Sequence, residues 1–479
     1  MHGCPASFVV QDAAESNFKL FDVGPTATKK LIDPCFLVPA IFEALKKHEK
    51  YQSVTQLVPG EADQFCAEDV CKQGGTVLTS DSDLLVHNLG HGRVAFFRDL
   101  RENDISRITF ASFVPEKIFK TIGLSYPEKA LQLAYERQLS PRATLAQIVL
   151  KSSKPCSRSA AYLDFQDNFT SPKSFDLWEY GKCKLPPESS DPRISELILN
   201  FYLLRKGGAT PSPIRMFLPP LLECPALKSA WDPSTCIRHL AYSLLGCSII
   251  HRDDLSVQEF RRVQALSSAG RKIPLFPFSL IQQYMDEIVS CGSKLKSFYN
   301  YGEYLFWIAL GITMEMSESQ RQGIEPIALK LYERGHNLNP TNISTHVSWA
   351  DIHIYAQVQG ILYSFRILRQ VLINMKEQSS KEATVVNEDV YSMLSQLTPV
   401  AHFPNFHDSL GAVKELCKRG VLESTMNTLV TTHEEDLQFD CNDSQTINET
   451  VDENPPINCV GLSSKSLHRN NMFSSLFID

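Results

Sequence analysis

The sequence lacks any long uninterrupted apolar segment. No window approaches the roughly 18 apolar residues that a membrane-spanning helix needs, so we predict no transmembrane segment. The first 30 residues have no extended apolar stretch and carry charges at Asp12, Glu15 and Lys29. A secretory signal is therefore not expected, and the sequence predicts an intracellular protein of the nucleus or cytoplasm that neither enters a membrane nor is secreted.

The sequence also lacks closely paired cysteines. It has 13 cysteines, none of them in C-x-x-C spacing. Structural zinc sites need such pairs, so we expect free thiols in a reducing compartment rather than zinc ligands or disulfides. Phosphate-binding P-loops, G-x-S-x-G elbows and G-x-G-x-x-G turns are absent too. These absences give no support to NTPase, α/β-hydrolase or dinucleotide-binding functions.

The sequence also lacks an excess of positive charge. Lys and Arg number 47 against 54 Asp and Glu, which gives a net charge of −7. No global basic field therefore attracts a polyanion. Binding of DNA or RNA would have to use a local basic patch or a bridging metal ion.

What is present is ordinary globular composition, with 43% hydrophobic and 21% charged residues over 479 positions. This length predicts about three structural units. Changes in pattern along the chain divide it into five parts. These are a poorly defined N-terminal segment (1–33), an α/β domain (34–150), a Ser/Lys/Pro-rich linker or long loop (151–190), a mainly α-helical region (191–430) and a disordered acidic tail (431–479).

Hydrophobic periodicity predicts the elements of the α/β domain. They are a helix beginning near Phe36, a strand over 54–58, a helix over 61–73 and strands over 76–79 and 93–97. The first two strands are expected to be parallel, because a helix connects them. In the helical region, periodic segments lie at 236–247, 300–316, 326–336 and 345–376. The tail carries eight acidic residues and no Lys or Arg between His433 and Glu453.

Four carboxylates follow the first two predicted strands. Glu61 and Asp63 come after strand 54–58, and Asp81 and Asp83 come after strand 76–79. Residues beyond the carboxyl ends of adjacent parallel strands meet in one crevice. Hard oxygen ligands suit Mg²⁺ or Mn²⁺, the ions of two-metal phosphodiester hydrolysis. The sequence therefore predicts that these four acids meet at a metal site.

A purely structural explanation accounts for each pair alone. Acids are favoured in the first turn of a helix, which is where Glu61 and Asp63 are expected. Asp-Ser-Asp over residues 81–83 is common turn chemistry. The two pairs at successive strand ends favour the metal site, and the structural alternative stays open.

The segment VPGEADQFCAEDVCKQGGTVLTSDSDLLVHNLGHGRVAFFRDL (58–100) resembles the XPG/flap-endonuclease superfamily, in its asteroid-like XPG-I branch. GEAD followed about twenty residues later by TSDSDLL carries the resemblance. The flanking PCFLVPAIFEAL (34–45) is similar to that branch, and MFLPPLLE (216–223), SAW (229–231) and IRHLAYSLL (237–245) resemble its helical region more weakly.

The resemblance implies a PIN-like fold, in which helices flank a twisted parallel sheet. It also implies that Glu61, Asp63, Asp81 and Asp83 are the catalytic, metal-binding residues of a Mg²⁺- or Mn²⁺-dependent nuclease. The family's Gly-Ser-Asp-Tyr segment is expected soon after Phe110, but SFVPEKIFKTIGL (112–124) stands there. An acid after an N-terminal first strand is missing as well, and we expect the nuclease core to be truncated at its N-terminus.

Two hypotheses follow. The first, which we favour, is a degenerate relative of structure-specific nucleases. It would act as a scaffold that binds nucleic acid, or that binds protein partners through the helical region. The alternative is an active metal-dependent endonuclease that cleaves flap or single-stranded DNA or RNA. His87 and Arg98 are candidate substrate contacts; a loop histidine and an exposed ion pair of Arg98 with Asp99 or Glu102 are the structural alternatives.

Overall fold

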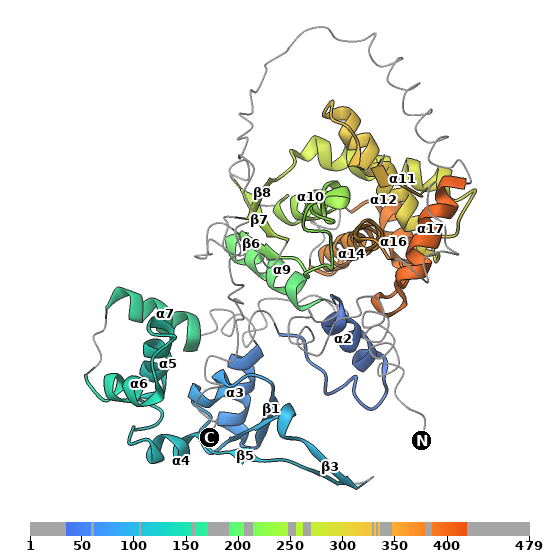
Figure 1. Cartoon of the computed structure of the whole chain (residues 1–479). Helices are drawn as coiled ribbons and strands as arrows, with labels where there is room; N and C mark the ends of the chain where they lie inside the picture. Colours follow the sequence, from blue (N-terminus) through green and yellow to red (C-terminus); the bar gives the residue numbers. More distant parts are fainter. Residues whose placement is uncertain are drawn as a thin grey trace. The chain divides into compact units, whose positions relative to one another are not determined.

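The computed structural model of the chain describes residues 35–58, 62–104, 107–155, 159–170, 191–205, 214–247, 255–261, 270–327, 330–331, 334–335, 347–378 and 386–418. It divides into two compact units (Figure 1). We call residues 60–182 and 441–479 the α/β unit, and residues 1–59 and 183–440 the helical unit. The predicted N-terminal segment (1–33) and acidic tail (431–479) lie outside the described residues.

The α/β unit begins with helix α3 and continues through short strands into four further helices. Its elements are α3 (Ala62–Gln73), β1 (Thr76–Thr79), the 3₁₀ helix η2 (Asp83–Val86), β2 (Arg93–Phe96), the 3₁₀ helix η3 (Phe97–Asp99), β3 (Arg101–Asp104), β4 (Arg107–Thr109), β5 (Ser112–Phe113), α4 (Pro115–Thr121), α5 (Ala130–Leu139), α6 (Leu145–Ser152) and α7 (Ala160–Thr170). The predicted helix at 61–73 and the strands at 76–79 and 93–97 are confirmed to within one residue. Helix α7 lies inside the stretch predicted as a linker.

The main sheet of this unit is small and mixed. Its order is β1-β2-β5, with β1 and β2 parallel and β2 and β5 antiparallel. Strands β3 and β4 form a separate antiparallel hairpin, whose β3 strand projects beyond the sheet in Figure 1. The described strands of the unit therefore give a mixed sheet with one parallel pair, and the twisted parallel sheet that we predicted is not confirmed.

The predicted strand over 54–58 is wrong. Residues 51–54 form a turn and residues 55–58 are irregular. The Val54 and Thr55 amides donate to the carbonyl oxygen of Tyr51, at 3.1 and 2.9 Å. Backbone donors used in a local turn are not available to a strand ladder. Val54, which the prediction placed in the strand, is 75% exposed.

The helical unit is built around one long helix. Its elements are α2 (Leu37–Lys47), α9 (Pro192–Arg205), β6 (Ile214–Phe217), η4 (Asp232–Ser234), α10 (Thr235–Gly246), β7 (Ser256–Phe260), β8 (Arg271–Pro274), α11 (Phe278–Leu295), α12 (Tyr304–Arg321), α14 (Trp349–Gln378), α16 (Glu388–Ser395), η7 (Val400–His402) and α17 (Phe406–Lys418). Three predicted periodic segments are confirmed as α10, α12 and α14, and the segment at 326–336 is described only in part. None of the described helices has the length and apolar character required to cross a bilayer.

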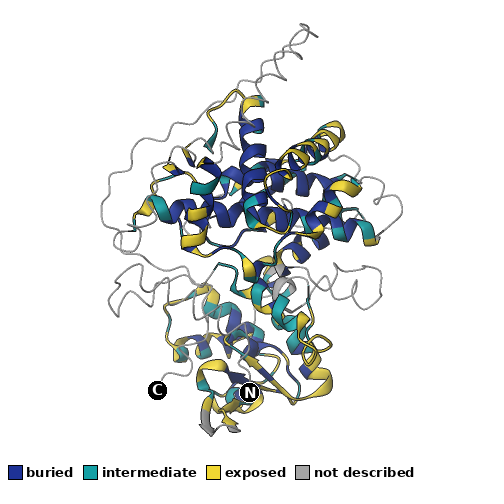
Figure 2. Cartoon of the chain, turned by 90° about the vertical axis from the view of Figure 1, so that its right-hand side faces the viewer, coloured by how far each residue is buried: buried dark blue, intermediate teal, exposed yellow. Residues whose placement is uncertain are grey.

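Helix α14 is the centre of this unit. It contacts α9, α10, α12, α16 and α17. Figure 2 shows buried residues concentrated in the packed helices, and α14 is buried along most of its length. A helix that is buried all round is an internal element, and the other helices pack on it.

Sequence reasoning missed a sheet in this region. Strands β6, β7 and β8 form a three-stranded sheet in that order, with β6 and β7 parallel and β7 and β8 antiparallel. Ile214, Val257 and Ile273 form a buried cross-strand row on its inner face. Strands of four or five residues give too short an alternation for a reliable signal.

Helix α2 packs in the helical unit, although the prediction assigned it to the α/β domain. The preceding Phe36 ring stacks on Tyr363 of α14, with centroids 4.6 Å apart and an interplanar angle of 6°. Glu43 pairs with the Arg366 guanidinium and accepts the Val400 amide at 3.2 Å. The structural division near residue 59 thus differs from the predicted boundary at residue 34.

A buried ion network joins η4, α10 and β7 in the helical unit. Arg238 donates from Nε to Glu259 Oε1 (2.7 Å) and from Nη2 to Oε2 (3.1 Å), and both side chains are fully buried. Arg261 Nε donates to Glu259 Oε2 (2.8 Å), the oxygen that also accepts Arg238 Nη2, and Arg261 also pairs with Asp232. Burial alone would raise the pKa of Glu259, but the two guanidiniums outweigh it and hold the pKa well below its usual value.

We predict that Glu259→Gln destabilises the helical unit by about 3–5 kcal/mol, because it leaves the buried Arg238 guanidinium without its counter-ion and Arg261 with Asp232 alone. Denaturant unfolding of the full chain, followed through the buried Trp231 and Trp307, measures this. The difference in stability between the native chain and Glu259→Gln should decrease as the pH falls below about 4.5. Because the folded pKa of Glu259 is depressed, its ionised carboxylate gives its full stabilisation only at pH values where Glu259 is also ionised in the unfolded chain.

The matched control is Lys330→Ala, which breaks an exposed pair with Glu325. It should change stability by less than about 0.5 kcal/mol. Equal effects of the two substitutions would contradict a stabilising role for the network.

Candidate functional site

The parallel register of β1 and β2 brings two loops to one edge of the sheet. Thr79, the last residue of β1, pairs with Phe96, the last residue of β2. The chain after β1 carries Asp81 and Asp83, and the chain after β2 carries Phe97 and Arg98. Both loops therefore leave the same carboxyl edge, which is the usual place for ligand sites in parallel sheets.

Asp81 and Asp83 lie in a hydrogen-bonded turn. The Asp81 amide donates to Thr79 Oγ1 (2.9 Å), and the Asp83 amide donates to Asp81 Oδ1 (3.0 Å). This is an Asx turn, in which the carboxylate fixes the backbone two residues further on. Both residues are half-buried, and Oδ1 of Asp83 is itself buried, so this edge of the sheet holds two acids in a defined position.

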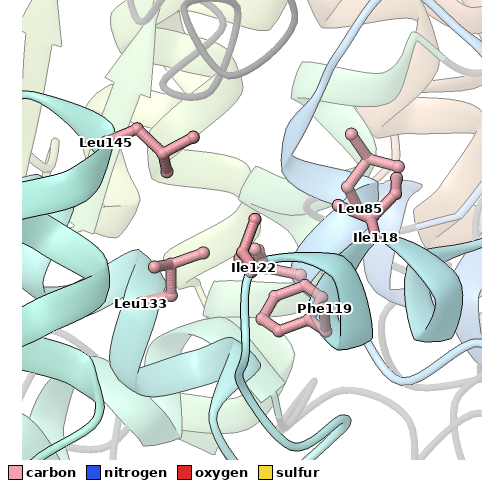
Figure 3. A pocket seen from close by; sticks show the side chains of 7 residues that line it. Leu85, Ile118, Phe119, Ile122, Leu133 and Leu145 are labelled. Atoms are coloured by element: carbon pink, nitrogen blue, oxygen red, sulfur yellow. The ribbon is translucent and has the colours of Figure 1, made fainter.

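Apolar packing of the residues that follow this turn holds it in place. Leu84 and Leu85 of η2 belong to the core formed with α3 and the sheet, whereas Val86 belongs to a second core formed with α4, α5 and α6. A small apolar pocket of about 30 Å³ remains beside η2, lined among others by Leu85, Phe119 and Leu145 (Figure 3). It offers a ligand no polar partner, so we assign it to packing and not to chemistry.

Asp63 lies in the first turn of α3, as predicted. Only Gly74 and Gly75, both with positive φ, separate the end of α3 from β1, so the helix runs back along the strand that it contacts. Twelve helical residues span about 18 Å, and β1 with the residues up to Asp81 spans about 20 Å. From these lengths we expect the first turn of α3, with Asp63, to lie toward the carboxyl end of β1.

The four predicted ligands are not all described. Glu61 lies outside the described residues, and among those that the structure does describe, no three His, Cys, Asp or Glu side chains come close enough to share a metal. A common site for Glu61, Asp63, Asp81 and Asp83 therefore stays a prediction. Two carboxylates of one turn do suit the usual Mg²⁺ mode, in which one or two acids, waters and substrate phosphates complete the shell.

His87 is buried behind the acidic turn. Burial lowers its pKa to about 4, and the neighbouring Asp81 charge opposes that shift. The Tyr126 hydroxyl donates to the His87 carbonyl oxygen (2.5 Å) and accepts the Leu89 amide (2.8 Å), which fixes this stretch of backbone. A neutral, inward imidazole fits the structural alternative for His87; its role as a substrate contact stays a prediction.

Arg98 is exposed on η3, directly after β2. Its guanidinium lies over the Phe96 ring, 4.6 Å from the centroid. No ion pair with Asp99 is present, and the side chain of Glu102 is not among those described. Arg98 thus places a positive charge at the edge that carries Asp81.

Sequence reasoning missed two aromatic residues at this edge. Phe97 is 52% and Phe110 49% exposed. The available signal was the pair Phe96-Phe97. Strand alternation sends one ring of such a pair to the core and the other outward, and Phe96 is fully buried.

We predict that protonation of His87 destabilises the α/β unit between pH 6.5 and 4. Because its folded pKa is depressed, the unfolded chain binds more protons in this window, and stability falls as the pH falls. The loss approaches about 1.4 kcal/mol per pH unit. Hydrogen–deuterium exchange of peptides covering η2 and β2 measures it, and His87→Gln should flatten the dependence. Equal slopes in both proteins would contradict this assignment.

Comparison with known proteins supports the family resemblance. Residues 33–275, just over half of the chain, match the family described as XPG domain containing. No curated protein matches the sequence, and no solved structure matches it. The matched range includes α3, the acidic turn, the β1–β2 edge and the buried ion network. By this match, the chain belongs to the XPG-domain-containing family.

Proposed function

We propose that this protein is a cation-dependent nucleic-acid-binding scaffold. The Asp81–Asp83 turn would hold a Mg²⁺ or Mn²⁺ ion, with Glu61 and Asp63 as the further acids of the site. The ion would supply the positive charge that attracts a nucleic-acid phosphate. This mode suits a chain with a net charge of −7, because binding does not require a basic surface.

The observation that carries the proposal is the register of β1 and β2. It places the acidic turn and Arg98 at one carboxyl edge. Membership of the XPG-domain-containing family supports phosphodiester-containing ligands for such an edge. The resemblance of residues 58–100 to the asteroid-like branch supports the same four acids.

The hydrogen bonds of the turn favour binding over hydrolysis. Asp81 Oδ1 already accepts the Asp83 amide, which leaves this carboxylate fewer free ligand positions. In-line hydrolysis needs two correctly held ions. Where the superfamily is expected to supply a further Asp after Phe110, this chain has β5 and the start of α4.

The second candidate is an active metal-dependent endonuclease, which family membership favours. The two candidates differ in one observable, the cleavage of the bound strand. A cleavage assay under the conditions of the binding assay distinguishes them.

The helical unit offers a separate surface for a partner. Arg215, Gln258 and Lys272 form a cross-strand row on the outer face of its sheet. Arg215 and Lys272 are exposed, and neither pairs with a described residue. A protein or RNA partner with negative charge fits this row, so we retain binding through the helical unit as part of the scaffold proposal.

We predict that Asp81→Asn weakens Mg²⁺-dependent binding of a fluorescent oligonucleotide about tenfold, equivalent to about 1.4 kcal/mol. Asn keeps the side-chain oxygen that accepts the Asp83 amide, so the turn is retained while the charge is lost. Fluorescence anisotropy in Mg²⁺ and in EDTA measures the effect. In EDTA the variant and the native chain should bind alike.

Asp69→Asn is the matched control, because Asp69 is exposed on the same unit and pairs with Gln73 on α3. It should leave the Mg²⁺ dependence unchanged. If native binding is insensitive to EDTA, or if both substitutions act equally, the proposed cation bridge is wrong. Cleavage of the oligonucleotide that Asp81→Asn abolishes would establish the nuclease instead.

A further inference from the structure

Phe97 and Phe110 flank the base of the β3–β4 hairpin, because Phe97 follows β2 and Phe110 precedes β5. On one side of them Ala95 pairs with Ser112, and on the other side Arg101 pairs with Thr109. Both residues therefore lie between the β2–β5 pair on one side and the β3–β4 pair on the other. They occupy a defined place on the α/β unit, where the chain leaves β2 and returns to β5.

Both rings are half-exposed, and neither makes a ring contact with a described residue. Burying a phenylalanine side chain stabilises a protein. Both rings forgo part of this stabilisation. Ile108, on the same hairpin, is also exposed, at 66%. Several exposed apolar side chains within one short stretch of a unit indicate an interaction site.

The charges around these rings select the ligand. Arg98 follows Phe97 directly and is exposed, and Arg101 at the start of the hairpin is exposed as well. The acidic turn with Asp81 leaves the same sheet edge. Flat apolar rings beside guanidiniums and a cation-binding turn fit a ligand that has both aromatic faces and phosphates.

We infer that Phe97 and Phe110 form a stacking platform for unpaired bases, and that Arg98 contacts the phosphate between them. The ligand of the carboxyl edge is then a single-stranded nucleic acid. This inference rests on the proposed function and makes it more specific, because it names the strand form that the site accepts.

The chemistry of stacking explains why a single strand is selected. In a duplex the base faces are covered by neighbouring pairs, whereas in a single strand they are available to aromatic side chains. Stacking on aromatic rings tolerates every base, since each has a π face. The site therefore discriminates by strand form and not by base sequence.

The test compares three probes of equal length: a fluorescent oligothymidylate, an abasic strand with the same phosphates, and a duplex. The full chain should bind the oligothymidylate at least tenfold more tightly than the other two. Phe97→Ala and Phe110→Ala should each weaken binding of the oligothymidylate about 5- to 150-fold, the range for loss of one stacked base. Binding of the abasic strand should not change.

Leu150→Ala is the matched control, because Leu150 is 65% exposed on α6 of the same unit. It should bind every probe as the native chain does. Phe97→Tyr should retain binding, because its ring can stack in the same way.

The outcomes separate this inference from the proposed function. If the native chain binds the abasic strand as tightly as the oligothymidylate, or if both alanine variants bind like the native chain, the stacking platform is wrong. The Mg²⁺ dependence lost in Asp81→Asn would then still support the cation bridge. Binding that needs the two rings but not Mg²⁺ would overturn the bridge alone. No binding of any strand would overturn both. A dimer that Phe97→Ala dissociates would make a second copy of the chain the occupant and overturn the inference.

Discussion

The parallel pairing of β1 with β2 is the constraint on which the candidate site depends. Because Thr79 and Phe96 end the two strands at the same level, the acids after β1 and the aromatic and basic residues after β2 share one edge. An antiparallel arrangement would have placed these loops at opposite ends of the sheet. The turn itself stays in place because η2, which follows it, inserts leucines into one core and Val86 into another.

The two units are stabilised in different ways. The helical unit has one large core around α14, and its buried charges are neutralised by several hydrogen bonds within the network of Arg238, Glu259 and Arg261. The α/β unit has two small cores and half-exposed rings at one edge. In many binding proteins a rigid interior positions functional groups that lie on short loops. Here the loops belong to the smaller unit, in which fewer contacts oppose local opening.

The sequence predicted part of this arrangement correctly. Strand β1, helix α3 and the position of Asp81 and Asp83 after β1 followed from short apolar runs and glycine stops, and the family resemblance followed from GEAD and TSDSDLL. The strand at 54–58 was wrong because its first two amides, those of Val54 and Thr55, bond locally to Tyr51, which no apolar pattern records. Phe97 and Phe110 were missed because their proximity depends on the pairing of β2 with β5 and of β3 with β4, a long-range property that one strand's composition does not contain.

Photo-crosslinking tests most directly whether one edge carries both the acidic turn and the strand. The full chain is irradiated in Mg²⁺ with a single strand of halogenated uracil, and the crosslinked tryptic peptides are identified by mass spectrometry. The account predicts adducts on VAFFR (94–98) and ITFASFVPEK (108–117), which are lost in EDTA. Adducts confined to peptides of the helical unit, or unchanged by EDTA, would contradict it.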